Sequence, residues 1–484
     1  MPIFEASTPL PVSREAAFAW HARPGALPRL LPPWEDIRVL QTAGTIENGA
    51  RVVLGVKPPG SPIRFDLVAE HDSYQPPELF RDRLVETPLD AIRLWEHVHR
   101  FEEAGDNTSR LVDRIEYELN YGPAGKWAEG SVMQDKLAAM FRYRHRVTRD
   151  DLAFHAAYSQ EPKTILVTGA SGLVGQALCA MLSTGGHTVR KLTRSEPDEA
   201  NEFRWRPSDG TLDEAALDGV DAVVHLAGES IMGRWTERKK RRIRQSRVNS
   251  TRLLAERVAA MDRRPALVVA SAIGWYGSRG DEIQTEDAPV ADDFLADVCR
   301  EWEAAADPAR EAGARTAHVR LGIVLSPEGG ALANMLPAFK MAVGGPVGSG
   351  DQYWSWVARD DAAAMFAWAA LNDSVEGPVN ATAPDAVTSR EFAAVLGRVL
   401  NRPAVLPAPA FLLKAALGEM ADGLLLASAR VQPKRTRELG YEFRFDDLEG
   451  ALRHLLGRTL PESSTATNER PASAAESEIL KPDA

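Results

Sequence analysis

The pattern of hydrophobic and polar residues divides the chain near residue 150. From Ile37 to about Leu119, apolar and polar residues alternate with a period of two, which predicts strands with one buried face. Asn48-Gly49 is a turn signal between two β-rich runs, and a polar GDNT turn separates IRLWEHVHRF from SRLVDRIEYEL. Residues 124 to 147 then show helical spacing, and one side of this segment carries Met133, Leu137, Met140 and Phe141. The pattern predicts a curved antiparallel sheet closed by a long helix.

The pattern changes after residue 163, where short apolar runs alternate with helical segments. These runs are TILVTG, TVRKLTR, DAVVHLAG, ALVVASAIG and HVRLGIVLS. Strands this apolar, separated by helices, predict a parallel sheet covered on both faces. The polar sequence at 148–162 suits a short helix or a linker.

The remainder of the chain predicts a small lobe and a tail. From about residue 402 the segment PAVLPAPAFLLKAALGEMADGLLL is mostly helical, and from residue 458 the chain is rich in Ser, Thr, Pro, Glu and Ala, which predicts disorder. The fold class is therefore α/β, a doubly wound parallel sheet with a small C-terminal helical lobe, preceded by an α+β domain. The expected segments are an α+β domain at 1–150, a parallel α/β domain at 163–400, the lobe at 401–457 and the tail at 458–484.

Composition narrows the class of partner. The 484 residues suggest about three domains. Acidic residues outnumber basic ones by 68 to 57, which disfavours nucleic acid and anionic membranes as partners. Two cysteines fit a reducing compartment, and no apolar stretch reaches membrane-spanning length. The N-terminus also lacks a basic region followed by an apolar run, so we expect a cytoplasmic protein without a membrane span.

The strongest chemical signal is the segment KTILVTGASGLVGQAL at residues 163–178. Gly169 can turn the chain tightly off a strand, Gly172 lets backbone approach a pyrophosphate, and Gly175 lets a helix pack on the strand. Because the motif follows a strand and opens a helix, it predicts a dinucleotide site. The predicted binding loop comprises Gly169, Ser171, Gly172, Leu173, Val174 and Gly175.

The end of the second strand indicates which dinucleotide binds. An acidic residue there would hold the ribose hydroxyl of NAD, but this chain has Thr193 and Arg194. The planar guanidinium of Arg194 can hold a 2′-phosphate, which favours NADP over NAD. The alternative is that Arg194 is an ordinary exposed arginine.

The order of segments in the first part resembles a known family. FRDRLVE, WEHVHRFE, LVDRIEYELN and FRYRHR, in that order, resemble the START-like (SRPBCC) helix-grip family, which includes polyketide cyclases. The resemblance covers residues 1 to about 150. It implies a cavity for an apolar ligand, such as a small molecule or a lipid.

Residues 163 to about 456 resemble a second family. GxxGxxG, HLAG and VNSTRLL resemble extended short-chain dehydrogenase/reductases and sugar-nucleotide epimerases. SAIGWYG, WEAAA, RLGIVLSPEGGALANMLPAF and GGPVGSGDQYWSW narrow the match to the atypical branch described as NAD-dependent epimerase or cell-division-inhibitor-like proteins. By resemblance, the cofactor site would also include Thr193, Arg194, Leu226, Ala227, Gly228, Arg247 and Leu325.

Two further features are interpreted as mainly structural, with Arg247 as the exception. In the basic run from Arg234 to Arg252, most residues are expected to form one solvated helix face, and only Arg247 is predicted to face the cofactor phosphates. His97 and His99 share one strand face, and Asp113 lies among apolar residues on the next strand. We interpret these histidines as packed or solvent-facing and predict no metal site, since metal sites normally need three or four ligands.

The catalytic residues usual in this superfamily are missing. A tyrosine followed four residues later by a lysine normally transfers the proton, and this chain contains no Tyr-x-x-x-Lys. At the corresponding segment, FLADVCREWEAA offers Cys299 as its titratable thiol. Ser271 and Tyr276 remain the best polar candidates near a nicotinamide. The alternative for both is structural, with the hydroxyl bonding backbone and the phenol packing in a loop.

Two functions are consistent with this sequence. The first is an NADP-dependent oxidoreductase or epimerase-like enzyme acting on a small molecule, which the N-terminal domain could bind. The second is a non-catalytic NADP sensor related to division or the cell envelope. The missing Tyr and Lys favour the second, whereas a dedicated lobe over the cofactor favours the first, which we prefer.

Overall fold

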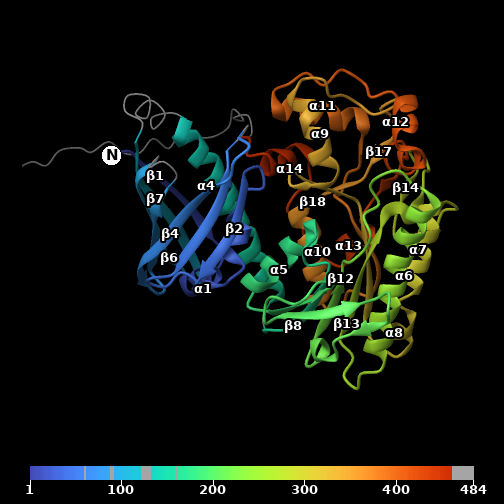
Figure 1. Cartoon of the computed structure of the whole chain (residues 1–484), viewed down its shortest axis with the longest axis horizontal. Helices are drawn as coiled ribbons and strands as arrows, with labels where there is room; N and C mark the ends of the chain where they lie inside the picture. Colours follow the sequence, from blue (N-terminus) through green and yellow to red (C-terminus); the bar gives the residue numbers. More distant parts are fainter. Residues whose placement is uncertain (59–60, 88–91, 121–131, 160, 460–484) are drawn as a thin grey trace, which may run out of the picture.

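The computed structural model describes residues 1–58, 61–87, 92–120, 132–159 and 161–459. Its N-terminal part is a seven-stranded antiparallel sheet in the order β1-β7-β6-β5-β4-β3-β2. The elements are β1 (Ile3–Leu10), α1 (Arg14–Ala22), α2 (Ala26–Leu30), β2 (Asp36–Ala43), β3 (Arg51–Lys57), β4 (Phe65–Gln75), β5 (Leu79–Glu86), β6 (Ile92–Gly105), β7 (Thr108–Leu119) and α4 (Val132–Tyr158). The sheet curves around α4 (Figure 1), which confirms the predicted antiparallel sheet with a long helix.

Helix α4 is longer than the sequence pattern predicted. Residues 148–158, expected to form a short helix or linker, continue the same helix. They stay helical because this stretch is buried: Leu152 and Phe154 pack in apolar cores, and Asp151 is fully buried in an ion pair. The predicted helical residues 124–131 and the tail from residue 460 lie outside the described residues.

The second part contains an eight-stranded sheet in the order β11-β10-β9-β8-β12-β13-β15-β19. Its strands are β8 (Thr164–Thr168), β9 (Thr188–Thr193), β10 (Glu202–Arg206), β11 (Thr211–Leu212), β12 (Ala222–His225), β13 (Ala266–Ala272), β15 (Thr316–Leu321) and β19 (Gly377–Ala381). Every pairing is parallel except that of the short β11. This sheet confirms the predicted doubly wound α/β fold.

Helices cover the parallel sheet. They are α5 (Leu173–Thr184), α6 (Glu237–Ala259), α7 (Phe294–Ala304), α8 (Asp307–Glu311) and α10 (Arg359–Leu371). Helix α10 contacts α5 and three central strands, and every residue of it is buried. A helix buried on all sides needs a partner beyond the sheet, and α4 of the N-terminal part supplies one (Figure 1).

A second apolar core builds the upper lobe in Figure 1. The lobe elements are β16 (Ile323–Ser326), α9 (Gly330–Lys340), β17 (Tyr353–Trp354), β18 (Trp356–Ala358), β20 (Val387–Thr388), α11 (Ser389–Leu400), α12 (Ala410–Leu417), η4 (Ala421–Leu425) and α14 (Leu448–Leu455). Its buried residues run from Leu325 to Leu456, on both sides of the predicted boundary at residue 400. Conversely, Tyr441 packs against Trp368 in the core of the parallel sheet.

Buried ion pairs join the N-terminal part to the rest of the chain. The Arg29 guanidinium of α2 donates to both carboxylate oxygens of Asp151 on α4 and, at 2.7 Å, to Asp360 on α10. Arg444 donates to the same Asp151 at 2.7 Å. The neighbouring Asp361 accepts from the backbone N–H groups of residues 444 and 445 and from the Tyr441 hydroxyl.

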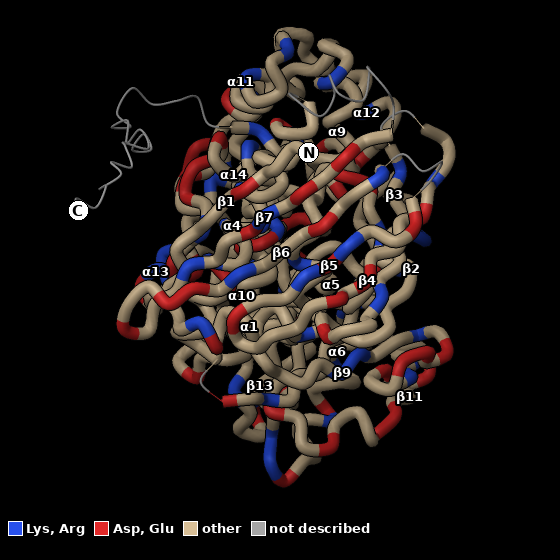
Figure 2. The backbone as a smooth tube through the Cα atoms, turned by 90° about the vertical axis from the view of Figure 1, so that its left-hand side faces the viewer, with Lys and Arg blue, Asp and Glu red and all other residues tan. Residues whose placement is uncertain are grey.

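The surface and the helices add two observations about partners. Figure 2 shows acidic and basic residues interspersed over the molecule, whose net charge is −11. Among the described residues, no helix combines the length and the hydropathy that a bilayer crossing requires.

Candidate cofactor site

The glycine loop joins β8 to α5 and is closed by contacts that leave no room for side chains. Gly169 has a φ of +69°, and a Cβ on it would lie 2.8 Å from the Leu226 carbonyl carbon. A Cβ on Gly175 would lie 2.2 Å from the Gly169 carbonyl oxygen. Gly172 is the N-cap of α5 and provides no side-chain cap. The N–H groups of the first helical turn are therefore left for an anionic ligand.

The crevice beside this loop lies where the strand order reverses. Strand β8 pairs with β9 on one side and with β12 on the other. The Thr168 hydroxyl accepts from the backbone N–H groups of Leu226 and Ala227, each at 3.2 Å, and so ties the loop after β12 to the end of β8. His225 contacts Thr168 and, through Nε2, the Ser250 hydroxyl at 2.9 Å. Dinucleotides bind at such a switch point in doubly wound sheets.

Thr193 is the last residue of β9 and Arg194 follows it, one strand away from the glycine loop. The Arg194 side chain is exposed, whereas Thr193 is half-buried and its hydroxyl lies 2.8 Å from that of Ser195. The pKa of Glu229, in the loop after β12, is lowered mainly by a hydrogen bond from Lys239, and the charge of Arg194 contributes. The structure thus brings the charge of Arg194 close enough to Glu229 of the β12 loop to lower the pKa of that carboxyl.

Arg247 lies beneath the loop after β12. Its guanidinium donates to the Glu229 carbonyl at 3.0 Å and lies 4.9 Å from the Trp302 ring centroid. A Cβ on Gly228 would lie 3.3 Å from the guanidinium carbon, so the exposed Gly228 allows this close approach. Arg247 therefore supports the loop through backbone contacts rather than pointing freely toward phosphates.

Leu325 is fully buried at the end of β16, and the turn that follows it reaches the glycine loop. A Cβ on Gly329 would lie 3.7 Å from Leu173 Cδ1, and one on Gly330 would lie 3.9 Å from Cδ2. Leu173 and Val174 are half-buried in the first turn of α5, and Ser171 is exposed. The structure therefore brings Leu325 and the predicted loop together, although they are about 150 residues apart.

Ser271 and Tyr276 are joined in one buried network. Ser271, near the end of β13, donates to Glu303 Oε1 at 2.6 Å. The Tyr276 phenol donates to Asn380 Oδ1 at 2.7 Å and accepts from Arg320 at 3.0 Å.

Three members of this network, Glu303, Arg320 and Asn380, were not found from the sequence. Arg320 donates to both oxygens of Glu303. Glu303 lies in the WEAAA segment and Arg320 in the HVRLG segment, both of which had been identified from the sequence. Nothing in the spacing of the two segments indicated that these side chains would pair.

The burial of Tyr276 bears on the choice between a catalytic and a structural role for its phenol. The side chain is fully buried, and burial raises its pKa to about 12. A phenol bonded on both sides and neutral at pH 7 favours the structural alternative. Ser271 is likewise engaged with a carboxylate. Cys299 is no better a base, because burial raises the pKa of its thiol to about 12.

The lobe closes over the loop that follows β12. The Gly233 N–H contacts the Met420 sulfur at 3.1 Å, and the Trp235 ring packs against Phe294 at 5.3 Å. Lys240 forms an ion pair with Glu419 of the lobe. The adjacent α12 has no buried residue, and the exposed apolar residues near it are Val405, Leu406, Phe411 and Leu412.

Comparison with known proteins places this geometry in a family. The model of the NAD dependent epimerase/dehydratase family matches residues 165–381, and a domain of unknown function matches residues 408–455. An epimerase family protein of Mycobacterium bovis is 39% identical over 289 residues, which cover 60% of this chain and 96% of that protein. The human epimerase family protein SDR39U1 is 34% identical and is covered to 99%.

Two solved structures extend the comparison. A nucleoside-diphosphate sugar epimerase from Corynebacterium glutamicum is 35% identical with a TM-score of 0.77, covering 94% of this chain and 90% of that one. The human SDR39U1 structure with NADPH is 33% identical with a TM-score of 0.56, covering 60% of this chain and 99% of that one. Because the chain covers nearly the whole length of relatives that are more than a third identical to it over the aligned residues, it belongs to the NAD-dependent epimerase/dehydratase family.

Proposed function

We propose that this protein binds NADP(H) in the crevice between β8 and β12 and acts as an oxidoreductase or epimerase-like enzyme on a small molecule. The observation that carries the proposal is the uncapped start of α5 behind a glycine turn, with Arg194 exposed at the end of the neighbouring strand. The human relative, whose structure contains NADPH, supports the cofactor class.

The residues present fit such a cofactor. Gly169 and Gly175 leave a cradle that a Cβ would fill, and the first turn of α5 offers N–H groups to a pyrophosphate. Leu226 and Ala227 would lie beside the dinucleotide, and Arg194 would hold the 2′-phosphate. When bound, the nicotinamide supplies hydride transfer. The protein would orient the ring and exclude water through the lobe that covers the β12 loop.

The substrate class follows from the relatives. The Corynebacterium protein is described as a nucleoside-diphosphate sugar epimerase, so nucleotide sugars are the first compounds to test, followed by other carbonyl compounds. We also propose a cytoplasmic location, in keeping with two free thiols, Cys179 and Cys299. The START-like character of the N-terminal domain, and an apolar ligand in it, remain predictions.

Arg194→Asp tests the cofactor assignment. We expect NADPH affinity to fall about 10- to 100-fold, because a hydrogen bond to a charged group contributes roughly 1.5–3 kcal/mol. NADH affinity should change much less, since NADH lacks the 2′-phosphate. Fluorescence titration of both cofactors measures this. Arg264→Asp is the matched control, because Arg264 is exposed and precedes the start of β13, at the end of the parallel strands opposite the glycine loop. Equal losses of both cofactors would contradict the NADP assignment.

The buried Tyr276 supports a second candidate, a non-catalytic NADP-binding sensor. The chain contains no Tyr-x-x-x-Lys, and the phenol of the candidate Tyr276 is buried. A screen of nucleotide sugars and carbonyl compounds for NADPH oxidation separates the two functions. Turnover of any class supports the enzyme, whereas tight NADPH binding without turnover supports the sensor.

Tyr276→Phe tests the structural role of the phenol. Removing its hydroxyl leaves Asn380 and Arg320 each without one buried partner, which should lower the free energy of unfolding by about 1–3 kcal/mol. NADPH affinity should stay unchanged. Urea unfolding and cofactor titration give the two values. A stable variant whose turnover collapses would instead make the phenol catalytic.

A further inference from the structure

Ionisable side chains line the space between the N-terminal sheet and α4. Asp82 on β5 faces His97 on β6, and His99 on β6 faces Asp113 on β7, as cross-strand partners on one face of the sheet. His97, His99 and Asp113 are buried, and the Asp82 side chain is 18% exposed. Of the two alternatives expected for these histidines, they pack in the interior rather than face solvent, and in addition both contact two carboxylates.

The two imidazole rings lie between the two carboxylates. Asp82 Oδ2 is 3.4 Å from His97 Nδ1 and 3.5 Å from His99 Nε2. On the other side, Asp113 Oδ1 is 3.0 Å from His97 Nε2 and 2.7 Å from His99 Nδ1. Each ring thus turns one nitrogen to Asp113 and the other to Asp82.

We propose that Asp82, His97 and His99 bind a divalent transition metal ion, most suitably Zn²⁺, with Asp113 positioning both histidines. One ligand atom from each of the three residues lies within 4.8 Å of the others. With bonds of about 2.0–2.1 Å, two ligands of a tetrahedral zinc ion stand roughly 3.3 Å apart. The contacts of 3.4 and 3.5 Å around Asp82 match that edge length.

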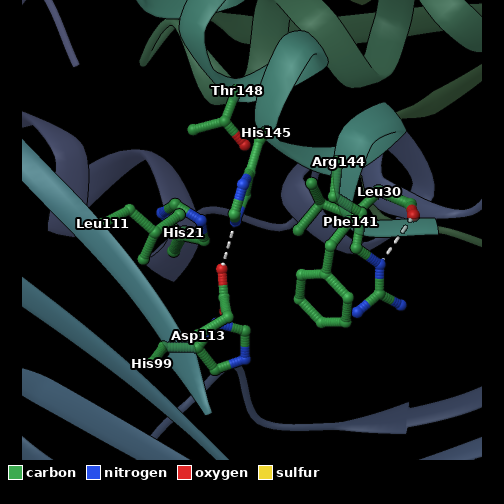
Figure 3. Close-up of a pocket in the computed structure, with 9 residues that line it drawn as sticks. All are labelled: His21, Leu30, His99, Leu111, Asp113, Phe141, Arg144, His145 and Thr148. Carbon is green, nitrogen blue, oxygen red and sulfur yellow. Dashed lines mark hydrogen bonds and ion pairs between the residues drawn. The ribbon is translucent and has the colours of Figure 1, made fainter. Parts of the chain in front are cut away.

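The contacts of Asp113 match the surroundings of a metal-binding histidine. Such a histidine usually donates its other ring N–H to a carboxylate, which sets the tautomer and the ring orientation. Asp113 meets this description for both rings, and it is itself held by His145 Nε2 of α4 at 2.6 Å (Figure 3). With their protons on the Asp113 side, both rings present lone pairs toward Asp82. An acceptor facing a carboxylate needs a cation between them.

An unsatisfied buried nitrogen lies beside this cluster. His71 Nδ1 is buried and has no hydrogen-bond partner among the described residues. His71 is the cross-strand neighbour of Asp82. On the far side of His99, a cavity of ≈ 10 Å³ is bordered by His21, Asp113, Arg144 and His145 (Figure 3). That volume suits about one water molecule, and not an apolar ligand.

Protons compete with a metal ion for the ring nitrogens of this site. Although burial alone disfavours a charged ring, the hydrogen bonds of Asp113 and Asp82 raise the pKa of His97. Zinc would displace these protons, because it binds neutral imidazole. Three protein ligands also leave the fourth position of a tetrahedral ion to water, the arrangement of catalytic rather than structural zinc sites.

Metal titration of the full chain tests the proposal. After dialysis against a chelator, the wild-type protein should bind one equivalent of Zn²⁺, release protons on binding, and give the visible absorption of tetrahedral Co²⁺. Asp82→Asn and His99→Gln should abolish stoichiometric binding. Asp113→Asn should weaken it by about 10- to 100-fold, as is typical for a partner of a ligand. His318→Gln, a buried histidine of β15, is the matched control and should bind as the wild type does.

Three results would overturn the proposal. The first is a wild-type protein that binds neither Zn²⁺ nor Co²⁺ stoichiometrically, in which case the cluster is a set of protonated ion pairs. The second is unchanged binding by both Asp82→Asn and His99→Gln. The third is an octahedral Co²⁺ spectrum. Circular dichroism of each variant identifies misfolding, and Asp82→Asn is the least disruptive variant because Asp82 is partly exposed.

Discussion

Replacing Arg29 by methionine is expected to lower the free energy of unfolding by about 3–5 kcal/mol, the usual cost of leaving a buried charge without its partner. Arg29 is 2% exposed and is paired with Asp151 and Asp360, which are almost completely buried. Arg444 would still pair with Asp151. Asp360 would keep only the more distant Arg359 and His454, at 3.8 and 3.4 Å. Urea unfolding followed by circular dichroism measures the change.

A surface arginine provides the control for this effect. Arg51 pairs with Glu70 on the N-terminal sheet, but its side chain is 58% exposed. Arg51→Met should therefore change the free energy of unfolding by no more than about 1 kcal/mol. If Arg29→Met were equally mild, the buried ion pairs would not be holding the N-terminal part against α10.

The Arg29 variant should also respond differently to pH. In the wild type, despite burial, the Arg29 charge keeps the pKa of Asp360 well below its usual range, so this stabilisation is present above pH 4 and is lost only as the pH falls further. Without Arg29, burial pushes the carboxyl pKa upward, and the folded state then binds protons more readily than the unfolded state. The deficit of Arg29→Met relative to the wild type should shrink as the pH is lowered from 7 toward 5.

Gly175→Ala is expected to weaken NADPH binding at least tenfold and to lower the free energy of unfolding by about 1–3 kcal/mol, the usual cost of overpacking. The new Cβ would lie 2.2 Å from the Gly169 carbonyl oxygen and 2.9 Å from Ala170 Cα. Both are backbone atoms of the binding loop, so no side-chain rotation can relieve the contact. The loop must move, and the N–H groups that we propose to bind the pyrophosphate move with it.

Gly172→Ala is the matched comparison for this prediction. Its Cβ would lie 3.2 Å from the same Gly169 oxygen, which a shift of a few tenths of an ångström relieves, and its φ of −78° suits any residue. Stability should therefore change little, whereas cofactor affinity should still fall because the methyl group occupies the ligand side. A Gly175→Ala variant with wild-type NADPH affinity would show that the glycine loop is not the cofactor site.

Local patterns predicted most of the architecture. The period-two runs before Leu119 form antiparallel strands, and the apolar runs after residue 163 form the parallel sheet. These elements were predictable because a strand buried on one face alternates apolar and polar residues, whereas a strand buried on both faces is apolar throughout. The polar stretch at 148–162 was predicted as a short helix or a linker, and its residues up to Tyr158 are the end of the long helix α4. One of its polar residues, Asp151, is buried and forms an ion pair with Arg29. Composition cannot reveal this partner, because Arg29 is far away in the sequence.

The candidate sites also differ in how much of each the sequence predicts. By itself the sequence determined the glycine loop, because a positive φ and two close backbone approaches require glycines at set spacings within a few residues. Only the tertiary structure decided that Tyr276 is buried on Asn380 and Arg320, and that Asp82 faces His97 and His99 from another strand. Such contacts depend on strand register and domain packing, which join residues far apart in the chain and leave no periodic trace along it.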